Sequence, residues 1–259
     1  MSGKCRVRSP QSHVQSTSVS RTPHFVELGI SDKMPSSAFF LFREVTPREH
    51  KDLTYIRTCV LISMGRHSLR EDILDAGLEL MFREGYQAAT VRDICAAAGA
   101  PHGSFIHHFG TKEAFAREVL DRYFSGTRDF VKEALDDKSL SPRQRLKKYL
   151  DIISGYAADR KWNLGCLIGD FSLETASHSE LLRLRLEAIF QEWRTPFAAC
   201  IAEAQAAGEI ESTFDPVELA EFLLASWEGA ILRMKVERSP AALERFKTIA
   251  FQTVFKELK

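Results

Sequence analysis

Residues 90–115, TVRDICAAAGAPHGSFIHHFGTKEAF, carry the strongest local pattern in the chain. Thr90 and Asp93 have the spacing of a capping box, which satisfies free N–H groups at a helix start. Gly99 can adopt the left-handed conformation that ends a helix, and Thr111 is suited to cap the next one. The pattern predicts two short helices joined by a glycine turn, followed by a third helix. A helix-turn-helix of this layout places its second helix in a DNA major groove.

The apolar residues around these signals have the spacing that three packed helices require. Upstream, Ser68 and Glu71 predict another helix start and Gly85 predicts its end. The predicted faces are Leu69, Ile73, Gly77, Leu80 and Met81 upstream, Val91, Ile94 and Cys95 in the first short helix, and Phe105, Ile106 and Phe109 in the second. The alternative is an alanine-rich helical hairpin without a nucleic-acid role. Because caps, glycine and apolar faces agree, we favour the DNA-binding interpretation.

The segment resembles the TetR family of bacterial repressors. The matching residues are Thr90, Arg92, Ile94, Ala98, Gly99, Gly103, Ser104, His108, Phe109, Lys112 and Glu113. The resemblance is specific over about residues 68–125 and looser beyond. It implies an all-α homodimer with a three-helix DNA-binding domain, residues 66–115, and a helical effector-sensing and dimerisation domain, residues 116–259. One departure is Ile106, where the family usually has a tyrosine that contacts the DNA backbone.

The resemblance also implies which residues meet DNA. These are Thr90, Arg92, His102, Gly103, Ser104, His107, His108 and Lys112. Arg92 and His102 would lie near base edges, where arginine is the usual partner of guanine. Ser104, His107 and Lys112 would contact phosphate or sugar, and Gly103 would allow close backbone approach. Residues 66–125 hold seven Lys or Arg against nine Asp or Glu, so we expect a specific dimer on a palindromic operator.

Composition limits the other functional classes. The 259 residues have a formal net charge of zero and no apolar run long enough to span a bilayer. Five irregularly spaced cysteines form neither a CxxC pair nor a disulfide framework, and the N-terminus lacks the apolar segment of a secretory signal. The common phosphate-loop, zinc-protease and serine-hydrolase motifs are missing from the sequence. We therefore expect a cytoplasmic non-enzyme without a cofactor, metal site or membrane partner.

Residues 1–65 differ from the rest of the chain. They are rich in serine, lack sustained helical periodicity, and carry nine Lys or Arg against five Asp or Glu. One interpretation is a basic disordered arm that adds phosphate contacts. The other, which we favour, is that translation starts at Met64 and leaves 196 residues, because MGRHSLRED resembles a usual start in the family.

Caps, prolines and glycines predict the helices of the second domain. Their expected ranges are 111–136, 142–160, 166–176, 177–208, 215–236 and 239–257, with Ser177 and Glu180 as the capping box of the fourth. Apolar stripes on the last two helices are candidates for both the monomer core and the dimer surface. The stripes are Leu223, Leu224, Trp227, Ile231 and Met234, then Phe246, Ile249, Ala250, Val254 and Phe255.

Residues 163–174, NLGCLIGDFSLE, resemble a sub-group that contains the N-ethylmaleimide reductase repressor and acrylate-responsive relatives. Cys166 follows a glycine near a predicted helix start, where backbone N–H groups favour a thiolate. Lys235 or Arg233 would lower the pKa of that thiol further. Trp162 is a fourth candidate at the effector site, in a pocket with Tyr156, Phe171, Trp193 and Trp227.

These observations predict a repressor that an electrophile, oxidant or unsaturated acid releases from DNA, with the helix that begins at Thr111 carrying the change. Cys166 could instead be a small buried hydrophobe, as free cysteine often is. In that case the ligand would bind noncovalently, with Arg194 or Arg233 as partner of an acid. Two other classes stay open, a DNA-binding protein without an effector and a thiol-dependent enzyme. The enzyme lacks an obvious partner for Cys166, because His178 is the only histidine after His108.

Overall fold

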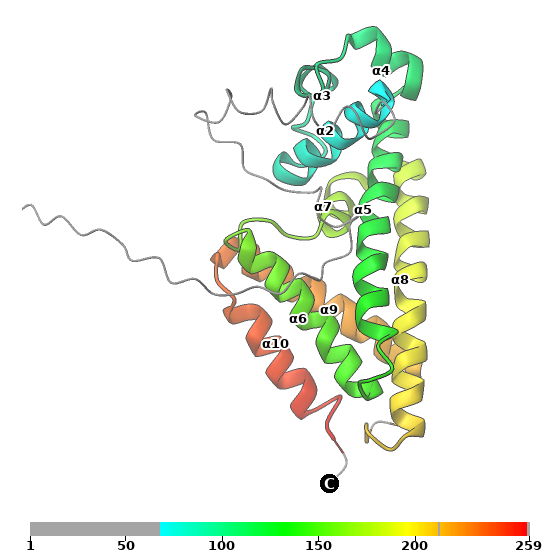
Figure 1. The fold of residues 1–259 in the computed structure, drawn as a ribbon, viewed down its shortest axis with the longest axis vertical. Coiled ribbons are helices and arrows are strands. Elements are labelled where there is room, and N and C mark those ends of the chain that lie inside the picture. The colour runs from blue at the N-terminus through cyan, green and yellow to red at the C-terminus, as the bar shows by residue number, and fades with distance from the viewer. Residues whose placement is uncertain (1–67, 212, 258–259) are drawn as a thin grey trace, which may run out of the picture. The chain divides into compact units, whose positions relative to one another are not determined.

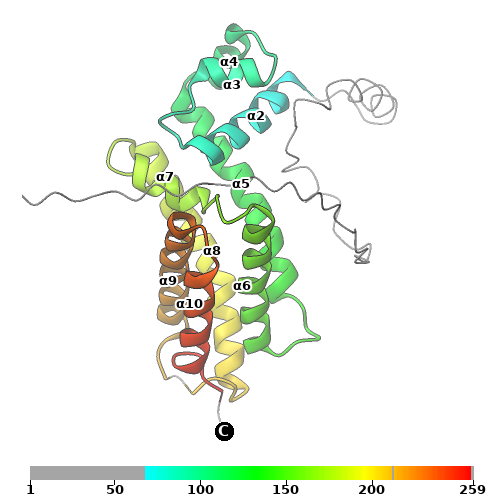
Figure 2. The same ribbon diagram turned by 90° about the vertical axis from the view of Figure 1, so that its left-hand side faces the viewer.

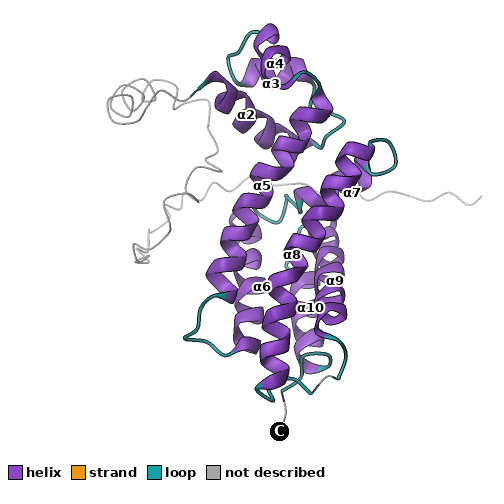
Figure 3. Cartoon of the chain, turned by 90° about the vertical axis from the view of Figure 1, so that its right-hand side faces the viewer, coloured by secondary structure: helices purple, strands orange, loops and turns teal. Residues whose placement is uncertain are grey.

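The computed structural model describes residues 68–211 and 213–257. All regular structure in these residues is helical (Figures 1 and 3). The helices are α2 (Leu69–Glu84), α3 (Val91–Ala97), α4 (His102–Phe109), α5 (Lys112–Leu135), α6 (Pro142–Asp159), α7 (Leu167–Thr175), α8 (Glu180–Ala206), α9 (Pro216–Glu237) and α10 (Ala241–Gln252). The predictions for residues 1–65 and for a start at Met64 lie outside the described residues. No helix in the described part has the length and apolar character needed to cross a membrane.

Helices α2 and α3 begin at the cap residues that the sequence indicates. The Thr90 hydroxyl accepts a hydrogen bond from the Asp93 backbone N–H at 3.2 Å and donates to the Asp93 carboxylate at 2.5 Å. Gly99 follows α3 with φ of 62°, a left-handed conformation that costs glycine little. Ser68 accepts from the Glu71 N–H, but the Glu71 carboxylate pairs with arginines instead of completing a capping box.

Three phenylalanines hold the helix-turn-helix together. Phe105, Phe109 and Phe115 are buried, with ring centroids 4.7 to 5.4 Å apart. Gly77 on α2 lies so close to Phe115 that a Cβ there would overlap the ring. The glycine therefore lets α2 and α5 approach each other around the aromatic cluster.

Ion pairs also connect α2 to α5. Arg70 pairs with Glu118, and Arg122 pairs with both Glu71 and Asp75, the latter at 2.7 Å. These side chains are 29–48% exposed, and exposed pairs usually contribute about 0–1 kcal/mol each. Arg70 of the DNA-binding domain and Arg122 of α5 are thus already paired with carboxylates.

The remaining helices pack as a bundle (Figure 2), in which α8 contacts α5, α6 and α9, α5 also contacts α6, and α10 contacts α9 and α6. Ser141 begins α6 with a complete capping box, and Asp215 caps α9 ahead of a proline. Large side chains such as Tyr149, Phe197 and Trp227 fill the interior. Arg145 is also buried, where it donates to the Leu135 carbonyl at 2.7 Å and pairs with Glu203.

One predicted helix start and one predicted helix end are wrong. Ser179 rather than Ser177 caps α8, because its hydroxyl accepts from the Leu182 N–H and also bonds to Glu113 on α5. The last helix ends at Gln252, several residues before Glu257, because Thr253 leaves helical geometry with φ of −121° and ψ of −83°.

The predicted stripe on α9 belongs to the interior of a single chain. Leu223, Leu224, Trp227, Ile231 and Met234 are all buried there. A different apolar face of α9 is exposed, and its residues are spaced three and four apart. This exposed face consists of Phe222, Ala225, Gly229, Leu232 and Val236. On the neighbouring α8, Leu184 and Phe190 are exposed as well, whereas on α10 the exposed member of the predicted stripe is Ile249.

Candidate DNA-reading helix and effector site

Helix α4 has one buried and one exposed face. Phe105 and Phe109 point into the domain, while His102, Gly103 and His107 are exposed. A Cβ on Gly103 would meet no described protein atom within 4 Å, so the packing of this domain does not require glycine there. Ile106, which is predicted to share the apolar face with Phe105 and Phe109, is instead 50% exposed, so that part of the prediction is wrong.

The other predicted DNA contacts differ in how exposed they are and in whether they already have a partner within the protein. The Arg92 side chain is 88% exposed, with its Nε 3.8 Å from an Asp93 oxygen. Ser104 and His108 are half-buried on α4. The Lys112 ammonium is already engaged within the protein. It donates a hydrogen bond to the Gln87 carbonyl at 3.3 Å and lies 4.6 Å from the centroid of the Tyr86 ring. Partial burial lowers the pKa of Lys112.

Cys166 is the N-cap residue of α7 and is only 8% exposed. The loop before it passes through Lys161 and Trp162, both in left-handed conformations with φ of 53° and 62°. Such conformations cost a non-glycine residue on the order of 1 kcal/mol each. Trp162 is half-buried and packs against the core, so side-chain contacts help to hold this loop.

The environment of Cys166 is opposite to the predicted one. Burial raises the pKa of its thiol well above the ordinary value, and the nearby Glu228 carboxylate raises it further. Backbone N–H groups of Gly169 and Ile168 act in the other direction, as expected at a helix start, but their effect is smaller. Burial also raises the pKa of the Glu228 carboxyl, to about 7. The prediction of a preformed thiolate is therefore wrong.

The two predicted cations do not stabilise a thiolate either. Lys235 reaches this region, with its Cδ 3.1 Å from where a Cβ on Gly165 would lie, but its ammonium pairs with Asp170 at 2.9 and 3.0 Å. Arg233 is exposed and pairs with Glu237 on its own helix. Among the described residues, no three His, Cys, Asp or Glu side chains are arranged to hold a metal ion.

Sequence reasoning missed Glu228, which is the group facing Cys166. A signal was present, since Glu228 is the only charged residue between Phe222 and Leu232. An isolated charge in an apolar helical run is costly unless it has a partner. The other cysteines of the described region are structural as expected. Cys95 is buried in the helix-turn-helix, and the Cys200 thiol lies 3.2 Å from the Pro142 carbonyl.

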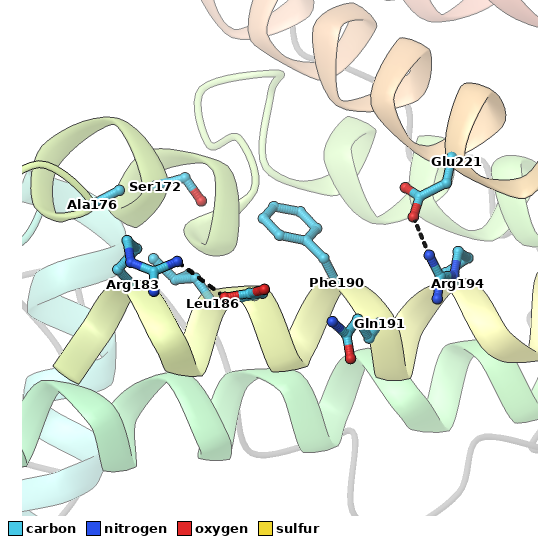
Figure 4. A pocket seen from close by; sticks show the side chains of 9 residues that line it. Ser172, Ala176, Arg183, Leu186, Phe190, Gln191, Arg194 and Glu221 are labelled. Carbon is cyan, nitrogen blue, oxygen red and sulfur yellow. Dashed lines mark hydrogen bonds and ion pairs between the residues drawn. The ribbon is translucent and has the colours of Figure 1, made fainter. Parts of the chain in front are cut away.

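Three of the five aromatic residues that the sequence places around a pocket belong to the core. Phe171, Trp193 and Trp227 are buried, Trp162 packs against the core, and the Tyr156 ring packs against Phe130. An open groove lies instead along α8, between α7 and α9 (Figure 4). Its lining residues are Ser172, Ala176, Arg183, Leu186, Glu187, Phe190, Gln191, Arg194 and Glu221. Arg194, a predicted acid-binding cation, pairs there with Glu221 at 2.5 Å.

The far end of α7 contacts the DNA-binding domain. The Glu174 carboxylate accepts hydrogen bonds from the Tyr86 N–H at 3.2 Å and the Gln87 N–H at 2.8 Å. Gly85, just before them, has φ of 91°, and a Cβ there would overlap the same carboxylate. One short helix therefore has Cys166 at its start and a link to the turn after α2 at its end.

Known proteins share both halves of this arrangement. Residues 73–119 match the profile described as bacterial regulatory proteins of the tetR family, and residues 142–250 match the tetracyclin repressor-like C-terminal domain. The chain is 40% identical over 191 residues to the HTH-type transcriptional repressor DhaR of Mycobacterium sp. strain GP1, covering 74% of this chain and 94% of that one. It is 28% identical over 182 residues to the HTH-type transcriptional repressor NemR of Escherichia coli K12, covering 69% and 89%.

The fold of the chain is also similar to that of a solved structure. The regulatory protein TetR from Rhodobacter sphaeroides superposes with a TM-score of 0.67 at 33% identity, covering 70% of this chain and 97% of that one. The all-α fold and the predicted family are thereby confirmed. With its helix-turn-helix and its C-terminal helical domain both matched, the chain belongs to the TetR family of transcriptional regulators.

Proposed function

We propose that this regulator is a homodimeric repressor that binds palindromic operator DNA and is released by a small electrophile, oxidant or unsaturated acid acting at Cys166. The face of α4 is the observation that carries the DNA-binding part. His102, Gly103 and His107 face solvent, while Phe105 and Phe109 hold the helix to its domain. This exposed face is what contact with the major groove requires.

In this proposal Arg92 and His102 contact bases, and Ser104, His107, His108 and Lys112 contact the backbone. The exposed Arg92 guanidinium suits a guanine, and Gly103 suits close approach because packing does not require a glycine there. Thr90 acts mainly as the cap of α3.

A binding experiment tests these roles. Footprinting of the promoter beside the gene would define an operator, and fluorescence anisotropy would then measure affinity. Arg92→Ala should cost about 1–3 kcal/mol on the operator, because a bidentate base contact is lost, and should change binding to unrelated DNA much less. Arg83→Ala is the matched control, since Arg83 is also exposed but pairs within α2. Equal losses for the two variants would contradict the assignment.

The dimer in this proposal forms through the last two helices, α9 and α10, on which Leu232 and Ile249 are exposed. The exposed stripe from Phe222 to Val236 includes Ala225 and Gly229, whose small size lets a second helix approach closely. Leu232→Glu should place a charge in that interface and give a monomer by light scattering. Leu173→Glu is the control, because Leu173 is 74% exposed on α7, away from this face. A dimeric Leu232→Glu protein would contradict the proposed surface.

The effector acts through α7 in this proposal. Cys166 lies at its start, and Glu174 binds the turn that follows α2. A group added at Cys166 has little free space and would displace the start of α7. Micromolar electrophile should release operator DNA from the wild type and from Cys200→Ser, but not from Cys166→Ser. Full release of Cys166→Ser would leave only a noncovalent ligand.

We also propose that the chain works in the cytoplasm and catalyses no reaction. His178, the candidate partner of a catalytic thiol, is exposed beyond the far end of α7. Nine helical residues separate them, which corresponds to about 13 Å. Turnover of a thiol-reactive substrate by the wild type, but not by Cys166→Ser, would contradict this.

A further inference from the structure

Cys166 and Glu228 form a buried acid–thiol pair between α7 and α9. A Cβ built on Gly169 would have both side chains within 4 Å, with the Cys166 Cβ at 3.9 Å, although Cys166 and Glu228 are far apart in the sequence. Oε2 of Glu228 also reaches the backbone of α7. A Cβ on Gly169 would lie 2.8 Å from that oxygen, closer than real Cβ contacts allow. Glycine at residue 169 is therefore what lets the carboxylate reach the start of α7 beside the thiol.

The second oxygen of this carboxylate has no partner. Oε1 of Glu228 is buried, and none of the described residues hydrogen-bonds to it. Buried polar atoms are nearly always paired in folded proteins, so an orphaned carboxylate oxygen needs an explanation. Stability does not supply one, because a glutamine or an apolar residue would cost less to bury. An acceptor that is kept free beside a thiol is suited to receive a proton.

The other ionisable groups near the pair cannot take that role. Lys235 on α9 is engaged with Asp170 on α7, and each group neutralises the other. The buried hydroxyls of Tyr123 on α5 and Tyr149 on α6 have raised pKa values, mainly through burial, and stay protonated at neutral pH. Glu228 is thus the one acceptor, among the described residues, that faces the thiol and can change its charge near neutral pH.

We propose that Glu228 is the base that removes the proton of Cys166 when the thiol adds to an activated double bond. The inference rests on the covalent form of the proposed function. Sulfur forms a bond to the carbon β to the carbonyl, the π bond breaks, and its electron pair moves to the carbon next to the carbonyl. The thiol proton passes to Glu228 and is then delivered to that carbon. Nothing is oxidised or reduced, and no group leaves.

This role explains how a thiol with a raised pKa can still react at neutral pH. A free thiolate is scarce because burial and the carboxylate both oppose it. A carboxylate with a pKa of about 7 is partly ionised at neutral pH, and a base works best when its pKa lies near the working pH. The proton then leaves as the S–C bond forms, and a buried thiolate does not have to exist beforehand.

The rate of alkylation tests the proposal. N-ethylmaleimide is the probe, and peptide mass spectrometry follows Cys166 apart from the other cysteines. The wild-type rate should rise through about pH 7 and level off as Glu228 ionises. Glu228→Gln should react about 100-fold more slowly at pH 8, the lower end of general-base effects, and its rate should climb only at higher pH. Glu237→Gln, on the same helix but exposed and paired with Arg233, should match the wild type.

The sign of the effect separates the proposal from simple electrostatics. If Glu228 only repelled a thiolate, removing its charge would lower the pKa of Cys166 and speed the reaction. An equal or faster Glu228→Gln rate therefore overturns the inference and leaves covalent sensing intact. A wild type in which maleimide does not label Cys166 overturns both. If Glu228→Gln fails to fold, the wild-type profile decides, since a rate that keeps rising past pH 9 overturns the inference.

Discussion

The link between Glu174 and the DNA-binding domain leads to a sharp prediction about how the effector signal travels. In the folded chain, the two carboxylate oxygens of Glu174 accept from the backbone N–H groups of Tyr86 and Gln87 at 3.2 and 2.8 Å. Glu174→Ala removes both acceptors without altering α4 or Cys166. We expect the variant to bind operator DNA and to be alkylated, but to release DNA less completely.

The size of the effect follows from these two bonds. A hydrogen bond to a charged group contributes about 1.5–3 kcal/mol, and the larger values apply where water is excluded. Gln87 is exposed and Tyr86 only half-buried, so water can replace part of what is lost. About 1.5 kcal/mol for the pair is therefore a reasonable figure. Since 1.4 kcal/mol corresponds to a factor of ten, the effector-induced loss of DNA affinity should shrink about tenfold.

Anisotropy titrations with operator DNA, before and after alkylation, measure this ratio directly. Glu180→Gln is the matched control, because it removes the same charge from an exposed residue that pairs with Arg183 on its own helix. Mass spectrometry must show equal labelling of Cys166 in all proteins. An unchanged ratio in Glu174→Ala would refute α7 as the route and return that role to α5.

Three further outcomes are expected. Gly77→Ala should lower the free energy of unfolding by about 1–3 kcal/mol in a urea titration, since its Cβ would overlap Phe115 and force the aromatic cluster to shift. Arg145→Met should cost about 1–3 kcal/mol by the same measurement, because it leaves the Leu135 carbonyl unpaired. Burial raises the pKa of Glu228 from 4.5 to about 7, so the folded state holds this proton more tightly than the unfolded state. Thermal melts should therefore show the free energy of unfolding falling by about 3 kcal/mol as the pH rises from about 4.5 to 7. Glu228→Gln should abolish this pH-dependent loss of stability.

The parts of the fold that could be predicted depend on neighbours in the sequence. Thr90, Thr111, Ser141 and Asp215 each cap the helix that follows, because a cap needs only its own backbone and the next three residues. The local pattern favours Ser177, whereas the residue that caps α8 is Ser179. The Ser179 hydroxyl also bonds to Glu113 on α5, a partner that no local pattern identifies.

The candidate site was less predictable, because its chemistry depends on which helices meet. A cysteine at a helix start favours a thiolate in isolation, but the depth of Cys166 and the arrival of Glu228 from α9 reverse that expectation. The same holds for α9, whose two apolar faces look alike in the sequence. Only packing decides that the face with Trp227 is buried and the face with Leu232 is left exposed.

The ion pairs between α2 and α5 have a consequence for ionic strength. The slope of affinity against salt is normally used to count the phosphates that a protein neutralises. Here Arg70 and Arg122 are bound to carboxylates of their own chain, and salt also weakens those exposed bonds. Added salt would therefore loosen the DNA-binding domain from α5 while it competes for the phosphates. Counting phosphates from such a slope would overstate the number of contacts that the protein makes.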